Sequence, residues 1–304
     1  MRRKVVKQGE STLMISLPSK WTKKFNLKKG DDVEVEEDED KIIISKETSS
    51  SKKSTKIKLK DSSDSIIRAA VINAYRAGYD LVEIEFDDEK AYKAINQTIQ
   101  DYVLGFDITK KEKNKVVIEN ITEPSADQFE NLFQKVFYNI SNLIDYTEKR
   151  LKGEPSLESY EEISYRIYKY ENFCRRVMVK RNLFGSSCNL FWSFAHLMTH
   201  GQRELYHLNR FLDKNNVKFN NFEIITKLKK LFSLLHEAYQ KKDISKIEEV
   251  HRIGNNAIYH DLYDSIQKGS KENIILYHLG SSIRNFYLAS SSLTGLLLES
   301  KSSV

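Results

Sequence analysis

Residues 9–36 read GESTLMISLPSKWTKKFNLKKGDDVEVE, and this stretch decides the fold of the N-terminal part of the chain. Leu13, Ile15 and Leu17 are separated by single residues, which is the period of a strand with one buried face. Pro18 follows directly, and proline has no amide hydrogen to donate to a strand ladder. Because proline suits the first turn of a helix, the pattern predicts a strand that gives way to a helix at this point.

The helix that follows is predicted to be short and one-sided. Trp21 and Phe25 are four residues apart, so their rings fall on the same side of a helix. The Gly-Asp-Asp triplet at 30–32 predicts a turn. Val33 then opens a second strand, and the Ile-Ile-Ile run at 42–44 closes the hairpin after an acidic turn. The expected order is therefore strand, short helix, turn and strand pair.

Charge is segregated along this first part of the chain. Residues 1–29 contain nine Lys or Arg against one acidic residue, a net charge of +8, whereas residues 30–47 contain nine acidic residues against two Lys, a net charge of −7. A small module with such an arrangement has a directional electric field, and its basic end can neutralise phosphates and release counterions. The alternative is an ordinary solvated surface on a lysine-rich protein. The agreement between pattern and charge favours binding to nucleic acid.

The first 47 residues resemble the AbrB/MazE/SpoVT family of swapped-hairpin DNA-binding domains. The residues that carry the resemblance are Lys4, Val5, Val6, Lys7, Gly9, Ser11, Thr12, Ser16, Leu17, Pro18, Trp21, Leu27, Gly30, Asp31 and Val33. The resemblance implies that two chains interleave their hairpins into one small barrel, so that the protein is a homodimer, and that basic residues on one face bind DNA.

Seven basic side chains are the expected DNA contacts. Arginines suit base edges better than lysines because a guanidinium can donate two parallel hydrogen bonds. The candidates are Arg2, Arg3, Lys4, Lys7, Lys20, Lys23 and Lys24.

The whole chain has 304 residues, 40% of them hydrophobic and 30% charged, which suits a globular protein of two or three domains. Cys174 and Cys188 form neither a CxxC pair nor a disulfide framework. No apolar run approaches the roughly 20 residues that span a bilayer, so no membrane insertion is expected. We also expect no signal peptide and a cytoplasmic location.

A polar linker is predicted over 48–54, followed by a small α/β domain over 55–122. Its hydrophobic pattern predicts the order β-α-β-α-β-β, an open sheet with two helices on one face. A spacer or dimerisation role is favoured over ligand sensing, because the pattern contains no Gly-rich phosphate loop. The stretch 76–80, RAGYD, resembles a step in the middle segment of archaeal regulators whose C-terminal part is PhoU-like.

Almost everything in the third domain, 124–304, is predicted to be helical. The apolar residues recur at helical spacing, with breaks at Gly153, Pro155 and Gly185. After a first helix that ends near Gly153, the predicted helices cover 157–183, then a stretch ending at 213, then 221–241, 244–268 and 271–299. Two sets of three long amphipathic helices indicate an internally duplicated bundle.

This helical architecture is similar to the PhoU family of double three-helix bundles, which regulate phosphate uptake and its two-component signalling. Together with the Ser-Leu-Pro-x-x-Trp form at 16–21, it implies an archaeal PhoU-like regulator of α+β multidomain class. PhoU bundles hold metal clusters on acidic repeats. Glu158 and Glu162 are spaced in that way, but the matching third helix carries histidines, so the pattern departs here.

His196, His200 and Glu204 lie along one edge of that third helix. Ligands four residues apart on a helix can share a metal, and histidine suits zinc, copper or iron. The alternative, that these are polar residues at the boundary of the core, fits their position beside an apolar stripe. The expected cofactor is therefore none, with a metal on these three residues as the candidate site.

No catalytic motif accompanies these features, so we expect no enzymatic activity. The chain contains no Walker A, GxSxG, HExxH or Rossmann fingerprint. The expected function is a DNA-binding regulator of phosphate uptake. The alternative is a PhoU-like adaptor that contacts a phosphate transporter or histidine kinase and uses its first module only to dimerise. A metal-dependent enzyme is the third reading.

Overall fold

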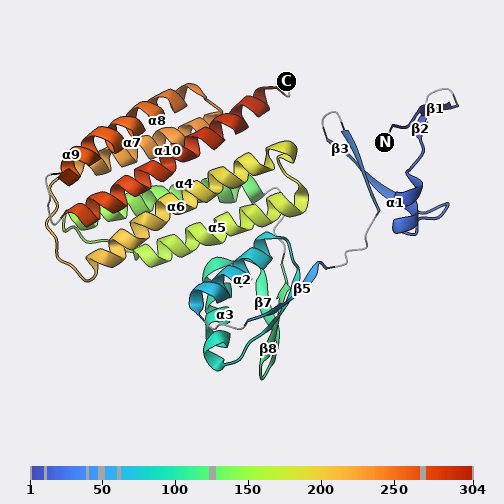
Figure 1. The fold of residues 1–304 in the computed structure, drawn as a ribbon, viewed down its shortest axis with the longest axis horizontal. Coiled ribbons are helices and arrows are strands. Elements are labelled where there is room, and N and C mark those ends of the chain that lie inside the picture. Colours follow the sequence, from blue (N-terminus) through green and yellow to red (C-terminus); the bar gives the residue numbers. More distant parts are fainter. Residues whose placement is uncertain are drawn as a thin grey trace. The chain divides into compact units, whose positions relative to one another are not determined.

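A computed structural model shows the fold of the protein (Figure 1). The structure describes residues 2–9, 12–38, 41–46, 52–59, 63–122, 128–267 and 272–302. The chain divides into two compact units, residues 1–52 and 53–304, and each is described by itself. The boundary falls within the predicted linker, whose residues 48–51 lie outside the described ranges, as do Glu10, Ser11 and Pro124.

The N-terminal unit has the predicted order of strand, short helix and strand pair. Its elements are β1 (Val5–Gln8), β2 (Thr12–Ile15), α1 (Ser19–Lys24), β3 (Val33–Asp38) and β4 (Lys41–Lys46). Strands β1 and β2 pair antiparallel with Val5 opposite Ile15, and β3 and β4 pair with Val35 opposite Ile44. The unit therefore consists of two separate hairpins joined through α1.

The second unit begins with the predicted β-α-β-α-β-β segment. Its elements are β5 (Ser54–Lys58), α2 (Asp64–Arg76), β6 (Leu81–Glu85), α3 (Glu89–Tyr102), β7 (Phe106–Glu112) and β8 (Lys115–Asn120). The strands form one sheet in the order β5-β6-β8-β7, in which β5 and β6 are parallel and the other pairs antiparallel.

One face of this sheet is apolar and the other is charged. Val82 and Ile84 of β6 are buried, whereas the alternating Glu83 forms ion pairs with Lys56 at 3.0 Å and Lys115 at 2.7 Å. Alternation of this kind is expected when only one face of an antiparallel sheet is covered. Helices α2 and α3 cover the apolar face and also contact the helical part of the same unit (Figure 1).

The remainder of the second unit is helical, as predicted. The helices are α4 (Gln128–Leu151), α5 (Tyr160–Arg181), a short 3₁₀ turn (Gly185–Ser187), α6 (Cys188–Leu212), α7 (Phe222–Lys241), α8 (Ser245–Asn256), a π-helical turn (Ala257–Asp261), α9 (Leu262–Gln267) and α10 (Asn273–Ser302). Helix α5 begins at a capping box, in which Ser159 and Glu162 satisfy each other's backbone amides. Among the described residues, no helix combines the length and the apolar composition needed to cross a membrane.

The helix predicted over 244–268 is interrupted. A π-helical turn separates α8 from α9, and the hydroxyl of Ser265 donates a hydrogen bond to the carbonyl oxygen of Asp261 at 2.7 Å. The turn places Leu262 against Gly280 of α10, where a Cβ atom would lie 2.3 Å from a Leu262 methyl carbon. Apolar periodicity does not reveal one extra residue in a turn, because the flanking positions still read as helical.

The buried side chains of α4 to α10 form one continuous hydrophobic cluster in the described part of the chain. Helices α6 and α10 pack closely, and Gly201 of α6 faces the ring of Phe286, where a Cβ atom would lie 2.4 Å from the ring. The helical class is confirmed. The division into two three-helix bundles stays a prediction; the described helices share one hydrophobic cluster.

The α/β segment and the helices, which the sequence predicts as two domains, lie within one compact unit. A buried polar junction connects them. Arg76, at the end of α2, donates from Nε to the Asn172 side chain at 2.6 Å and from Nη2 to Glu171 at 3.0 Å. The Asn172 amide in turn donates to the backbone oxygen of Tyr102 at 2.6 Å. Both Glu171 and Asn172 are fully buried on α5.

The RAGYD stretch forms the second half of this junction. Asp80 accepts hydrogen bonds from Lys180 at 2.8 Å and from Arg176, while Arg176 also donates to the backbone oxygen of Tyr79 at 2.8 Å. The backbone amide of Lys53, where the second unit begins, donates to Asp80 at 3.1 Å. The residues singled out by sequence therefore connect the start of this unit to α5.

Replacing Asp80 by asparagine is expected to lower the free energy of unfolding by about 1.5–3 kcal/mol at neutral pH, the contribution of hydrogen bonds to a charged group. Burial alone would raise the pKa of Asp80, but Lys180, the Lys53 amide and Arg176 hold that pKa below its ordinary value. A carboxylate with a depressed pKa stabilises the fold above the pKa of the unfolded state, about 4, and this contribution is lost as pH falls through the folded-state pKa.

The difference between wild type and Asp80→Asn should therefore shrink in acid, as measured by urea unfolding followed by circular dichroism. Asp87→Asn is the control, because Asp87 is exposed on the same unit. An equal cost for the two substitutions at neutral pH would contradict the role of Asp80.

Candidate nucleic-acid interface

The seven predicted DNA contacts lie on two neighbouring elements of the N-terminal unit. Arg2, Arg3 and Lys4 precede β1, and Lys7 belongs to β1. The other three, Lys20, Lys23 and Lys24, belong to α1. All seven are exposed, and none pairs with an acidic side chain among the described residues of this unit. They are therefore available to an anionic partner.

Helix α1 presents its lysines because its other side is apolar. The helix starts after Pro18, whose carbonyl oxygen accepts hydrogen bonds from the amides of Trp21 and Thr22 at 2.9 and 3.0 Å. The rings of Trp21 and Phe25 lie 5.4 Å apart and are half-buried, as the four-residue spacing predicts. This arrangement leaves the three lysines on the solvent side of the helix.

The predicted turn follows α1. Gly30 adopts a left-handed backbone with φ of +96°, which an L-amino acid rarely adopts. The backbone amide of Lys28 donates to the side chain of Asp31 at 2.8 Å, and this bond closes the turn. The turn separates the basic first hairpin and helix from the acidic second hairpin, so the opposite charges predicted from the sequence fall on different elements.

The apolar side chains of the two hairpins are exposed in the single chain. Val5 is 59% exposed, Leu13 70%, Ile15 54%, Val35 56% and Ile42 67%. None of the described side chains in residues 2–46 is fully buried. Isolated two-stranded hairpins are marginally stable in water, because they bury too little apolar surface. This unit therefore requires another surface to complete a core.

The histidine edge of α6 was the predicted metal site. The rings of His196 and His200 lie 4.3 Å apart, but Glu204 accepts a hydrogen bond from Nδ1 of His278 on α10 at 2.9 Å. In the described part of the chain, no three His, Cys, Asp or Glu side chains converge as metal ligands. The structure therefore brings the two histidines together but directs the carboxylate elsewhere.

Glu158 and Glu162, the two acidic residues considered for a metal repeat, also have structural roles. Glu158 pairs with Arg166, and Glu162 caps the start of α5 through Ser159. The hydrogen bond from Arg166 holds the pKa of Glu158 below its ordinary value. Glu158 is therefore ionised and occupied, and it is unsuited to act as a general acid near neutral pH.

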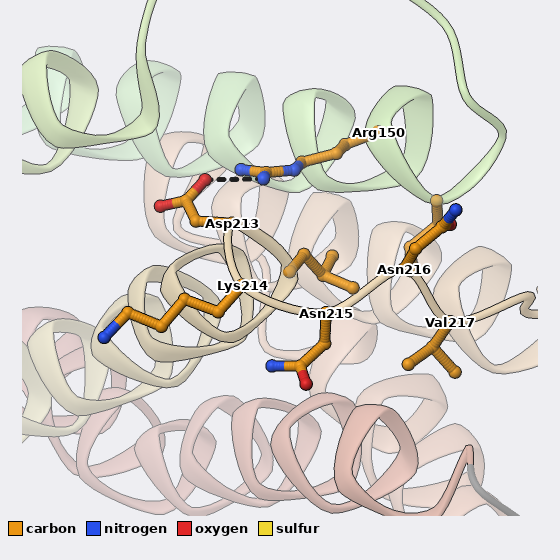
Figure 2. Close-up of a pocket in the computed structure, with 8 residues that line it drawn as sticks. Arg150, Asp213, Lys214, Asn215, Asn216 and Val217 are labelled. Carbon is orange, nitrogen blue, oxygen red and sulfur yellow. Dashed lines mark hydrogen bonds and ion pairs between the residues drawn. The ribbon is translucent and has the colours of Figure 1, made fainter.

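A pocket of about 380 Å³ lies where the end of α4 meets the segment between α6 and α7 (Figure 2). Its rim includes Arg150 and Asp213, which form an ion pair, together with Lys214, Asn215 and Asn216. The hydroxyl of Tyr160 also donates to Asp213, at 2.6 Å. Arg150 and Asp213 are thus engaged with each other, and the side-chain amide of Asn215 donates to the backbone oxygen of Phe211 at 2.8 Å. Sequence patterns had not indicated this pocket.

Comparison with known families gives one match. Residues 6–52 match the MazE antitoxin family, described as antidote-toxin recognition MazE, bacterial antitoxin. Comparisons with curated proteins and with solved structures give no match. The matched residues coincide with the N-terminal unit of two hairpins and α1. The chain therefore carries an N-terminal MazE/AbrB-type domain, a class of domain that commonly binds DNA and dimerises.

Proposed function

We propose that the protein is a DNA-binding transcriptional regulator of phosphate uptake that acts as a homodimer. The observation that carries the proposal is the coincidence of three features in the N-terminal unit: the family match over residues 6–52, the basic side chains that are exposed and form no ion pair among the described residues, and the exposed apolar faces of both hairpins. A solvated lysine-rich surface would account for the charge but not for the missing core.

The two chains would interleave their hairpins into one barrel. The apolar faces of β1, β2, β3 and β4 would then be buried, which is the main driving force for assembly. Dimerisation would place two copies of the basic surface on one face, and DNA contacts from two copies favour sites with two-fold symmetry. Lysines of α1 would neutralise phosphates, and Arg2 and Arg3 would reach base edges.

The helical part would sense or relay a signal to this barrel. Support for a phosphate signal comes from the resemblance of the helical sequence and the RAGYD stretch to PhoU-like regulators. Regulation at a distance requires that the signal binds differently to two arrangements of the protein. The hydrogen-bonded junction between the α/β segment and α5 would carry such a difference from one to the other.

A protein-binding role is the second candidate. The description of the matched family names recognition of a toxin. In this reading the N-terminal unit serves dimerisation, and the protein acts as an adaptor on a phosphate transporter or a histidine kinase.

The two candidates are separated by genome-wide recovery of DNA bound to the tagged full-length protein, in cells grown with and without phosphate. We expect enrichment at promoters of phosphate-transport genes, with a change when phosphate is withdrawn. Enrichment at other promoters would retain DNA binding and reject the phosphate role. Absence of enrichment in both conditions, with a transporter or kinase recovered instead, would favour the adaptor.

A further inference from the structure

Arg175 of α5 links side chains of α2 and α6: it shares Glu171 with Arg76, and its guanidinium lies 4.5 Å from the centre of the Trp192 ring, one helical turn before His196. We call Arg76, Arg175, His196, His200 and Arg203 the cationic cluster; Arg203 also donates to Nε2 of His207 at 3.4 Å. Arg76 and Arg175 both bond to Glu171, and the rings of His196 and His200 lie 4.3 Å apart. The cluster thus draws side chains from the α/β segment and from two helices of the bundle.

The carboxylates around the cluster do not balance its charge. Glu171 is fully buried and is shared by the two guanidinium groups of Arg76 and Arg175. Glu204, the next carboxylate on α6, is hydrogen-bonded to His278 at 2.9 Å. Two arginines therefore share a single carboxylate in a buried setting. An uncompensated buried positive charge is costly, so such a site favours an added anion.

Arg175 has an unused hydrogen-bond donor. It is 1% exposed, donates from Nε to Glu171, and stacks its guanidinium 4.5 Å from the centre of the Trp192 ring. Its Nη2 atom is buried and has no hydrogen-bond partner. Buried donors are almost always paired, so an unpaired guanidinium nitrogen is a specific sign of an acceptor that binds there.

Gln202 of α6 is a second buried polar side chain between α5 and α6. It is fully buried and interacts with the Tyr168 hydroxyl of α5, where burial raises the pKa of Tyr168 and the contact with Gln202 opposes that rise. Among the described residues, the unpaired donor beside the cluster is therefore Nη2 of Arg175.

The surroundings lower the pKa of both histidines. Partial desolvation of the His196 ring, which is otherwise exposed, lowers its pKa most, and the neighbouring His200 and Arg175 lower it further. Burial, Arg203 and Arg175 lower the pKa of His200, against the opposing effect of Glu204. Both imidazoles are therefore neutral near pH 7, and each can still donate one N–H.

We propose that the cationic cluster binds a small oxyanion, such as a phosphate or sulfate group. Arg175 would donate from its free Nη2 nitrogen, and His196 and His200 would complete the site from the exposed side. Planar guanidinium groups and N–H donors match the oxygen atoms of such anions. The inference that this anion is an effector of the regulator rests on the proposed function. The inference that the cluster binds an anion does not depend on that function.

The test is isothermal titration of the full-length protein, without DNA and at constant ionic strength, with inorganic phosphate, sulfate and glycerol phosphate. We expect saturable binding with one site per chain. The double variant His196→Leu/His200→Leu should weaken binding at least about tenfold, because it removes two N–H donors to a charged ligand. His260→Leu is the control, because His260 is exposed outside the cluster.

Tighter binding of inorganic phosphate or sulfate identifies a free anion, and tighter binding of glycerol phosphate identifies a phosphorylated metabolite; both support the site. Absence of binding by all three probes, or equal binding by the wild type and the double histidine variant, overturns it. If the Arg175→Gln variant folds, it tests the buried donor directly. If it does not fold, the double histidine variant decides whether the site exists, because His196 is exposed and its replacement does not disturb the core.

The anion site and the DNA-binding proposal can fail separately. Arg3→Ala/Lys7→Ala changes only the N-terminal unit and should leave phosphate titration unchanged. Loss of DNA binding in that variant with retained anion binding is the expected pattern. Anion binding by a protein that binds no DNA would retain the site and reject the regulator.

Discussion

The double variant Arg3→Ala/Lys7→Ala is expected to bind DNA at least about 100-fold more weakly than the wild type at low salt. Both side chains are exposed and unpaired among the described residues, so their removal costs the protein no internal contact. A dimer loses four contacts, a base contact from each Arg3 and a phosphate contact from each Lys7. The slope of log affinity against log salt should therefore decrease by about 0.9 for each phosphate contact, or about 1.8 in all.

A gel-shift titration at several salt concentrations measures both quantities. Lys93→Ala/Lys113→Ala is the matched control, because both lysines are exposed on the α/β segment of the second unit. This control removes the same net charge from the chain, but at positions far in sequence from the N-terminal unit. Equal affinity and equal salt slope in the Arg3/Lys7 variant and the wild type would reject this interface.

Replacing Ile15 by aspartate is expected to convert the dimer to a monomer and to abolish DNA binding. Ile15 is 54% exposed in the single chain and lies opposite Val5 across the first hairpin. If a second chain covers this hairpin, the substitution places a carboxylate in the shared core. An unpaired buried charge costs several kcal/mol, which exceeds what a small interface can offset.

Light scattering at micromolar concentration measures the mass. Ile121→Asp is the matched control, since Ile121 is 61% exposed in the second unit. We expect it to leave the dimer intact, because a charge at an exposed position costs little. A wild-type monomer, or an Ile15→Asp dimer, would contradict the swapped-hairpin assembly.

Local patterns predicted most elements of the fold. The helix expected over 221–241 is α7, Phe222–Lys241, and the β-α-β-α-β-β order of the α/β segment is as expected. These elements follow from periodicities of 3.6 and 2 that are visible within a few residues. The π-helical turn at Ala257–Asp261 was missed because the apolar positions on both sides still match a helix.

The candidate site residues divide in the same way. The seven basic residues could be selected from charge and motif alone, and the structure places all of them on exposed positions of β1, its approach and α1. The neighbouring rings of His196 and His200 also follow from helical spacing. The hydrogen bond between Glu204 and His278 could not be predicted in this way, because the two residues lie 74 positions apart in sequence.

The sequence by itself determined the elements, their order and the segregation of charge in the first 47 residues, since each depends on neighbours within a turn or a strand pair. Only the tertiary structure decided which charges meet. Arg76 and Glu171 are 95 residues apart, and their ion pair joins two segments that the sequence had separated. Long-range pairing depends on how packed elements approach one another, and that arrangement leaves no periodic trace in the chain. The cationic cluster, built from α2, α5 and α6, is visible for the same reason only in the folded protein.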